Sequence, residues 1–394
     1  MCKRFTVIGI SDSHRQYFPP EVLEVIRHSK IFSGGKRHNE IMERYLPEDS
    51  VWIDVTVPLK NVYEEYKRHE EVTVFASGDP LFYGYASTLQ REFPNAGIRV
   101  YPAFNSLQML AHRLNLPYQD MINVSLTGRP WKNLGDALIK GYPLIGVLTD
   151  KTKSPDAIAR RMLEYGYDNY DMTVGTCLGN EEEEDIERLS LEDASDRTFR
   201  NPNCIILRQI YPRKRYFGIP EPEFHHLDGR AKMITKMPIR LLSLSMLDLH
   251  QRKSFWDIGF CTGSVSIEAR LQFPQLDITS FEVREESREL MEKNCRKFGA
   301  PDIEYEIGDF LELDISGFNR PDAVFIGGHG GKLREMLERL RSVMLPGCVV
   351  VFNSVSHDSC ELFLKSTEDV GMQIVEEHTV ALDTFNPITI LKAQ

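Results

Sequence analysis

The sequence lacks the features that would place it in a membrane, outside the cell or around a metal. No run approaches the roughly eighteen apolar residues that a membrane span needs, and residues 1–11 lack the apolar core and cleavage site of a signal peptide. The seven cysteines form no C-x-x-C pair, and His225 and His226 alone supply no spaced set of metal ligands. We therefore expect a cytoplasmic protein with reduced thiols, no membrane contact and no bound metal.

Positive charge is also scarce. The chain has 47 Lys and Arg against 58 Asp and Glu, a formal net charge of -11, whereas nucleic-acid binding depends on clustered cations. We therefore expect no nucleic-acid partner.

The composition is that of a globular protein, at 42% hydrophobic and 27% charged, without a fixed-period repeat. At 394 residues the chain exceeds the usual size of one hydrophobic core, which predicts more than one domain.

Short strand-like runs alternate with helical patterns in the first half, which indicates α/β layers. The expected strands are 5–10, 72–76, 99–101 and 144–148, and the clearest expected helices are 20–28 and 106–114. A stretch rich in proline, charge and aromatic residues but poor in periodicity then interrupts the pattern. We predict a first domain at 1–212, a linker at 213–228 and a second domain at 229–394.

The pattern restarts after residue 237 as alternating helices and strands, which predicts a doubly wound, Rossmann-like parallel sheet. The expected helices are 238–247, 264–272 and 286–298, and the expected strands are 254–258 and 277–282.

A glycine turn is the strongest local signal in this second half. The strand ending at Asp257 passes through Gly259, Phe260, Cys261, Thr262 and Gly263 into a helix, and the next strand ends in Glu282. A carboxylate about twenty residues after such a turn can accept hydrogen bonds from ribose hydroxyls.

Gly308 and Asp309 follow the third strand, where the carboxylate could bond an adenine amino group. A dinucleotide could use the same features. The G-x-x-x-G spacing and the short turn favour S-adenosylmethionine, which has no pyrophosphate.

Polar turns follow several strands of the first half as well. They place Gly9, then Ser77, Gly78, Asp79 and Pro80 with Tyr83, then Ser106, and then Thr127 after strand-like runs. Each residue alone is typical of a helix cap or turn. Together they predict one cleft that binds a polar ligand.

The motifs FTVIGIS, GGKRH, ASGDPLFYG, PAFNSLQMLAHRL and LTGRP, in this order, resemble the tetrapyrrole methylase family, in particular its cobalamin C5-methyltransferase type. The second half is similar to decarboxylating C15-methyltransferases in MITKMPIRLLSLSMLDL, WDIGFCTGSVSIEA, FIGGHGG and FNSV. The resemblance implies a two-lobed first domain and one S-adenosylmethionine site in each domain. The resemblance implies that the first site includes Gly9, Ser77 to Pro80, Tyr83, Ser106 and Thr127. It implies that the second includes Thr235, Gly259 to Gly263, Glu282, Gly308 and Asp309.

The resemblance also implies the reaction: methylation of a precorrin or cobalt-precorrin at C5 and C15 in cobalamin biosynthesis, with loss of the C12 acetate carboxyl group. It implies a homo-oligomer. His329, Lys236 and Arg240 are the candidates for contact with substrate carboxylates, although a loop histidine and solvated cations are the alternatives.

The chain departs from the family pattern at three positions. It has Ser11 and Cys261 where glycines are common, and Thr127 where a histidine is common. Two other functions remain open at this point. One is a nicotinamide-dependent oxidoreductase. The other is a non-catalytic binding protein that retains the fold, in which these three residues would mark the loss of activity.

Overall fold

The computed structural model describes residues 4–382 and 386–394. The chain divides into two compact units, each with its own core. The first unit comprises Met1–Pro130, Tyr142–Arg160 and Asn169–Tyr211, and the second comprises Trp131–Gly141, Arg161–Asp168 and Pro212–Gln394. The domain limits at 212 and 228 stay a prediction, because the contacts assign two short stretches before residue 212 to the second unit.

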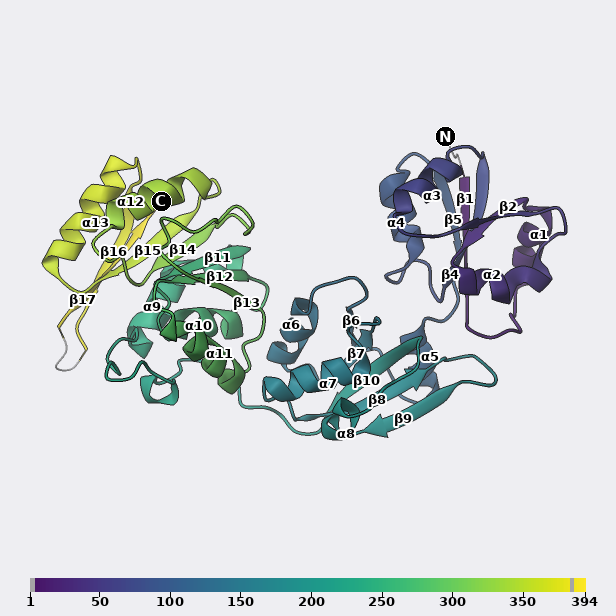
Figure 1. Cartoon of the computed structure of the whole chain (residues 1–394), viewed down its shortest axis with the longest axis horizontal. Coiled ribbons are helices and arrows are strands. Elements are labelled where there is room, and N and C mark those ends of the chain that lie inside the picture. Colours follow the sequence, from purple (N-terminus) through teal and green to yellow (C-terminus); the bar gives the residue numbers. More distant parts are fainter. Residues whose placement is uncertain (1–3, 383–385) are drawn as a thin grey trace. The chain divides into compact units, whose positions relative to one another are not determined.

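The first sheet of the first unit is parallel, with strand order β3-β2-β4-β1-β5. Its strands are β1 (Arg4–Ile10), β2 (Ile31–Gly34), β3 (Val51–Asp54), β4 (Glu71–Ser77) and β5 (Gly97–Tyr101). The helices are α1 (Pro20–His28), α2 (Lys36–Met42), with the short η1 (Glu43–Tyr45), α3 (Leu59–Tyr66) and α4 (Tyr85–Glu92). Apolar residues of α1 and α2 pack on one face and those of α3 and α4 on the other (Figure 1). Burial on both faces explains the nearly continuous apolar runs of β1 and β4.

The second sheet of this unit is mixed, in the order β6-β7-β10-β8-β9. Its strands are β6 (Ile122–Ser125), β7 (Leu144–Leu148), β8 (Tyr170–Thr176), β9 (Asp185–Leu189) and β10 (Asn203–Gln209), and the helices of this stretch are α5 (Ser106–Arg113), α6 (Lys132–Lys140), α7 (Pro155–Glu164) and α8 (Leu191–Ser195). β6 and β7 are parallel, whereas β10 runs antiparallel to β7 and β8. The sequence predicted the layers but not this change of direction.

The third sheet lies in the second unit, with strand order β13-β12-β11-β14-β15-β17-β16. Its strands are β11 (Ser254–Ile258), β12 (Asp277–Glu282), β13 (Ile303–Ile307), β14 (Ala323–Ile326), β15 (Val349–Ser354), β16 (Ile374–Val380) and β17 (Ile388–Ala393). The helices are α9 (Met237–Met246), α10 (Ser264–Gln272), α11 (Glu286–Phe298), α12 (Leu333–Val343) and α13 (His357–Asp369), with the short η2 (Glu221–Glu223) and η3 (Leu249–Gln251).

Helices cover both faces of this sheet: α9 and α10 pack on one face and α12 and α13 on the other (Figure 1). The predicted doubly wound fold is therefore confirmed. The sheet adds β16 and β17, which are antiparallel to each other, and β17 is antiparallel to β15. None of the helices in the described part of the chain is long and apolar enough to cross a membrane.

A buried ion pair fixes the chain where it enters the second unit. Arg240 on α9 and Glu268 on α10 are both fully buried, with Nη2 and Oε2 3.2 Å apart. Glu268 also accepts backbone N–H groups of Gly218 (2.9 Å) and Ile219 (3.0 Å). Arg240 donates to the carbonyls of Ile219 and Thr235. Part of the predicted linker is therefore held firmly against α10.

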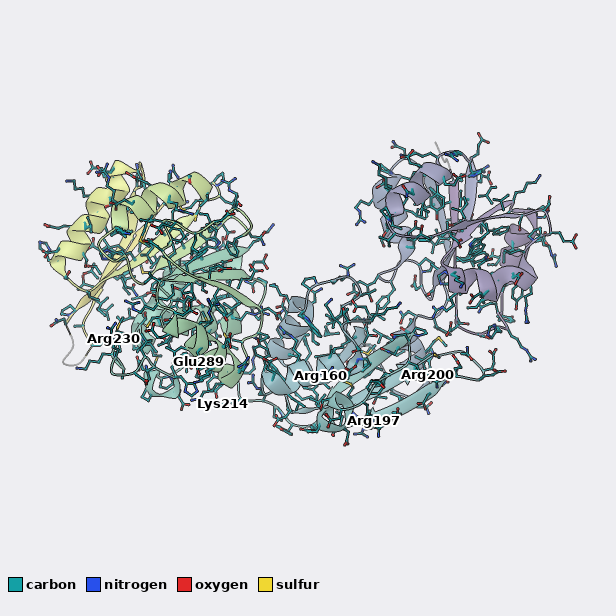
Figure 2. All side chains as sticks on the ribbon, viewed as in Figure 1. Arg160, Arg197, Arg200, Lys214, Arg230 and Glu289 are labelled. Atoms are coloured by element: carbon teal, nitrogen blue, oxygen red, sulfur yellow. The ribbon has the colours of Figure 1, made fainter. Side chains whose placement is uncertain are left out.

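We predict that Arg240→Ala lowers the free energy of unfolding by about 3–5 kcal/mol, because it leaves the Glu268 carboxylate buried without its cation. The matched control is Arg230→Ala, since Arg230 is exposed in the same unit (Figure 2) and its loss should change stability by less than about 0.5 kcal/mol. Urea unfolding followed by circular dichroism measures both. Equal midpoints for the two variants would contradict the anchoring role.

Candidate functional site

A cavity of about 870 Å³ opens at the carboxyl ends of the third sheet. Each of the parallel strands contributes the segment that follows it, including Gly259 after β11, Gly308 after β13 and Gly327 after β14. Ligands bind at this edge in open α/β sheets, because the loops there can separate around them. The cavity is thus the candidate site of the second unit.

Glu282 lies at the end of β12 in the wall of this cavity and is 3% exposed. Its Oε2 accepts the Cys261 N–H at 2.9 Å. Its Oε1 accepts the backbone N–H groups of Val283 (2.9 Å) and Arg284 (3.1 Å) and the Arg284 guanidinium (2.8 Å). Oε2 therefore keeps a lone pair for a ligand hydroxyl, whereas Oε1 is already saturated.

The turn before α10 needs its glycines for two different reasons. Gly259 has φ of 81°, and a Cβ there would lie 2.7 Å from the Gly328 nitrogen, so the turn passes close to the loop after β14. Gly263 has φ of 74°, and its Cβ would meet Met291 Sδ at 2.5 Å. Gly259, Phe260, Cys261 and Thr262 line the cavity. Gly263 instead allows α10 to pack against α11.

Cys261 occupies the turn with φ of 50°, a left-handed conformation that is strained for a residue with a side chain. Its Sγ donates to the Met233 carbonyl at 3.2 Å, which links the turn to the segment before α9. Burial, together with the nearby Glu282 charge, raises the pKa of the thiol to about 11. Cys261 is therefore a neutral thiol at neutral pH rather than a nucleophile.

Asp257, which the sequence marked only as a strand end, is fully buried in the cavity wall. Ser266 donates to its Oδ2 at 2.5 Å, and Oδ1 has no hydrogen-bond partner among the described residues. Burial raises the pKa of the carboxyl to about 7, against the lowering effect of Ser266. A buried, unsatisfied oxygen at this position suits a polar ligand group.

Asp309 follows β13 in the cavity lining as predicted, but it already has a cationic partner. Lys332 Nζ lies 2.7 Å from Asp309 Oδ2, and this hydrogen bond holds the pKa of Asp309 below its usual value. Both residues line the cavity. Lys332 was not predicted, although it directly follows the glycine-rich GGHGG loop.

The three predicted catalytic candidates do not come together. His329 and Lys236 line the cavity, as does Thr235. His329 Nδ1 accepts the Gly331 N–H at 3.1 Å, and burial lowers its pKa, so the ring is neutral at pH 7 and carries its proton on Nε2. The prediction for Arg240 is wrong, because its guanidinium is buried against Glu268 and does not line the cavity.

In the first unit, the predicted residues Gly9 and Ser77 to Pro80 lie at the adjacent ends of β1 and β4. A Cβ on Gly9 would overlap the Gly78 carbonyl and lie 2.6 Å from the Ala103 nitrogen. Gly78 has φ of 63°, and its own Cβ would meet the Asn105 Cα, next to Ser106 at the start of α5, at 2.8 Å. These turns are therefore in close contact.

Tyr83 and Thr127, two further predicted site residues of this unit, both hydrogen-bond to backbone carbonyls in or next to the second sheet. The Tyr83 hydroxyl donates to the Asn123 carbonyl on β6 at 3.1 Å, and the Arg129 guanidinium lies 5.2 Å from its ring centroid. Thr127 donates through Oγ1 to the Thr149 carbonyl at 3.0 Å, after β7.

The GGKRH motif contributes residues that the sequence analysis did not place in a site. His38 Nε2 lies 2.9 Å from Ser77 Oγ, and Arg37 donates to the same oxygen at 3.1 Å. Burial and the Arg37 charge lower the pKa of His38 to about 4, so the ring is neutral. No group of three or more His, Cys, Asp or Glu within residues 4–382 and 386–394 is placed to hold a metal ion.

Two family models match the chain. The model of tetrapyrrole (corrin/porphyrin) methylases matches residues 4–195, and the model of the precorrin methyltransferase domain matches residues 223–392.

Curated relatives match the whole chain or one half of it. A precorrin-6Y C(5,15)-methyltransferase [decarboxylating] of Sinorhizobium sp. is 30% identical over 94% of this chain and 89% of its own length. A cobalt-precorrin-6B C(15)-methyltransferase (decarboxylating) of Salmonella typhimurium is 32% identical over 41% of this chain and 83% of its own. A cobalt-precorrin-7 C(5)-methyltransferase of the same organism is 28% identical over 45% and 87%.

We predict that Asp257 makes stability fall with rising pH. Its pKa is about 7 in the folded protein against 3.8 for an ordinary Asp, so the folded state holds the proton more tightly. The proton bound to Asp257 therefore stabilises the folded protein fully below pH 3.8, and this stabilisation is lost as the pH rises to about 7. Unfolding free energies of wild type and Asp257→Asn, measured across this range, should diverge in favour of the variant. A constant difference would contradict the shift.

We predict that Cys261→Gly is close to the wild type in stability, since glycine avoids the roughly 1 kcal/mol cost of a left-handed residue but also loses the contact with Met233. Cys261→Ala keeps that cost and loses the contact with Met233, so it should be less stable than the wild type by about 0.5–1 kcal/mol. Thermal unfolding compares the three proteins. A glycine variant less stable than the alanine variant would show that backbone strain is not what matters at this position.

Proposed function

Since the chain belongs to the precorrin-6Y C5,15-methyltransferase (decarboxylating) family, we propose that each half binds S-adenosylmethionine and transfers one methyl group to a precorrin or cobalt-precorrin. The first half would methylate C5, and the second would methylate C15 and remove the C12 acetate carboxyl group. The assignment to halves rests on the relatives that match one half only, a C(5)-methyltransferase and a C(15)-methyltransferase. A nicotinamide-dependent oxidoreductase leaves the first half unexplained and is not favoured.

The cavity beside Glu282 is the observation that carries the second donor site. The glycine turn approaches the loop after β14 so closely that only glycine fits at Gly259, and Asp257 Oδ1 is buried without a hydrogen-bond partner among the described residues. Both features fit a polar, closely wrapped ligand. Glu282 Oε2 would hold a ribose hydroxyl, Asp309 the adenine amino group, and Thr235 with Phe260, Cys261, Thr262 and Gly308 would complete the site.

In the first unit, the turns that meet around Gly9 and Gly78 would hold the other donor molecule. Ser77, Asp79, Pro80 and Ser106 would contribute to it together with Tyr83 and Thr127. Ser77 Oγ accepts a hydrogen bond from Arg37, whose Nε lies 3.2 Å from Asp12 Oδ1, so an ion pair lies beside this hydroxyl.

The chain's own groups mainly have to bind, align and exclude water. S-adenosylmethionine supplies an electrophilic methyl group on a sulfonium. An electron-rich tetrapyrrole carbon needs no strong base, so alignment of the two reactants accounts for most of the catalysis. Lys232, Lys236 and Arg284 line the cavity and would pair with substrate carboxylates, while neutral His329 would donate a hydrogen bond through Nε2. Self-association and a cytoplasmic location are also part of the proposal.

We predict that S-adenosylhomocysteine titrated calorimetrically into the full chain binds at two sites. Glu282→Gln should weaken one of them about tenfold or more, because an amide replaces a buried charged acceptor. The control is Glu289→Gln on the exposed surface of α11, which should change nothing (Figure 2).

A single site in the wild type would contradict the two-site proposal. Absence of any binding would contradict the methyltransferase assignment itself.

A further inference from the structure

Lys332 lies in the cavity wall of the second unit, where the chain leaves the loop after β14 and enters α12. Its backbone N–H donates to the His329 carbonyl at 2.8 Å, and its carbonyl accepts the Met336 N–H at 3.1 Å. Leu333, the next residue, is fully buried. The backbone of Lys332 is therefore held on both sides, whereas its side chain is 54% exposed and available to a ligand in the cavity.

The ammonium group of Lys332 and the carboxylate of Asp309 place a hydrogen-bond donor beside an acceptor. Nζ lies 2.7 Å from Asp309 Oδ2, and Asp309 Oδ1 accepts the Leu311 N–H at 3.0 Å. An ammonium group has three N–H donors, and each carboxylate oxygen can accept two hydrogen bonds. Beyond the contacts that the described residues make, the two side chains therefore keep both donors and acceptors for a ligand.

This pair of side chains is complementary to one edge of adenine. The base carries the N6 amino group, a donor, next to N7, an acceptor, and a neighbouring acceptor and donor on a protein can bond both. Hypoxanthine has an oxygen in place of the amino group, so that it presents two acceptors on the same edge. One of them would face the Asp309 carboxylate, which cannot donate when it is ionised.

The strand order favours N7 over N1, the other ring acceptor beside the amino group. Asp309 follows β13, Glu282 ends the neighbouring β12, and Lys332 follows β14 on the far side of β12 and β11. With the ribose at Glu282 and the amino group at Asp309, the Lys332 side chain approaches the base from the side of the ribose. N7 lies nearer to the ribose than N1 does.

We infer that Lys332 determines specificity at the second donor site, with its ammonium group donating to N7 of adenine while Asp309 accepts the amino group. The inference rests on the proposed function. The contact with Lys332 also keeps the pKa of Asp309 below its usual value, so the acceptor is ionised at neutral pH. A lysine that only joined the two loops would not distinguish one base from another.

The first test removes N7 from the ligand. S-adenosylhomocysteine and its 7-deaza analogue, in which a C–H group replaces N7, are titrated calorimetrically into the full chain, and the site that Glu282→Gln weakens is followed. The wild type should bind the analogue about tenfold or more weakly, because a hydrogen bond to a charged donor is lost. Lys332→Met should bind S-adenosylhomocysteine about tenfold more weakly and should no longer distinguish the two ligands.

Lys293→Met is the matched control. Lys293 is 51% exposed and paired with Glu289, but it is not one of the described residues that line the cavity. This variant should keep both affinities of the wild type. A wild type that binds the two ligands equally well would overturn the inference. So would a Lys332→Met protein that still prefers S-adenosylhomocysteine, because Lys332 would then act without contacting N7.

The second test addresses Asp309 alone. The wild type should bind S-inosylhomocysteine about tenfold or more weakly than S-adenosylhomocysteine, and Asp309→Asn should reduce this preference, because an amide can donate to the hypoxanthine oxygen. If Asp309→Asn has this effect but Lys332→Met still distinguishes the 7-deaza analogue, the proposed donor site stands and the inference about Lys332 is wrong. A wild type that binds no S-adenosylhomocysteine would overturn both.

Discussion

A carboxylate and a guanidinium enclosed in the second unit hold together the parts of the chain that surround its cavity. Glu268 binds the backbone at Gly218 and Ile219, and Arg240 binds the carbonyls of Ile219 and Thr235. The segment between these attachment points supplies Lys232 and its neighbours to the cavity wall. The charges have little access to water, so each depends on the other. The position of this cavity-lining segment is thus set by a pair of residues that do not line the cavity themselves.

Local periodicity was enough to predict several of the elements. Residues 254–258, 264–272 and 286–298 have the limits expected from sequence, because strand and helix patterns are complete within each segment. The last two strands, β16 and β17, are among the elements that were not expected. β16 contains Glu376, Glu377 and His378 in succession and is largely exposed, so it lacks the apolar alternation that identifies a strand. Its place depends on pairing with β17, which a local pattern does not contain.

The residues of the candidate site also differ in whether a local sequence pattern could identify their role. Glu282 was predicted because a strand end and a glycine turn are both visible locally, and the structure brings them together through the Cys261 N–H. Arg240 was misassigned because a cation in a sequence carries no sign of its partner, and Glu268 lies 28 residues further along.

The place of β17 affects how the protein can be made. This strand, Ile388–Ala393, lies between β15 and β16, so the last residues of the sequence occupy the interior of the third sheet rather than its edge. During synthesis β15 and β16 have no partner on that side until residue 393 has emerged, whereas all strands of the first unit are already available. The strands of the first unit can therefore pair before those of the third sheet, and the third sheet closes only when β17 is available.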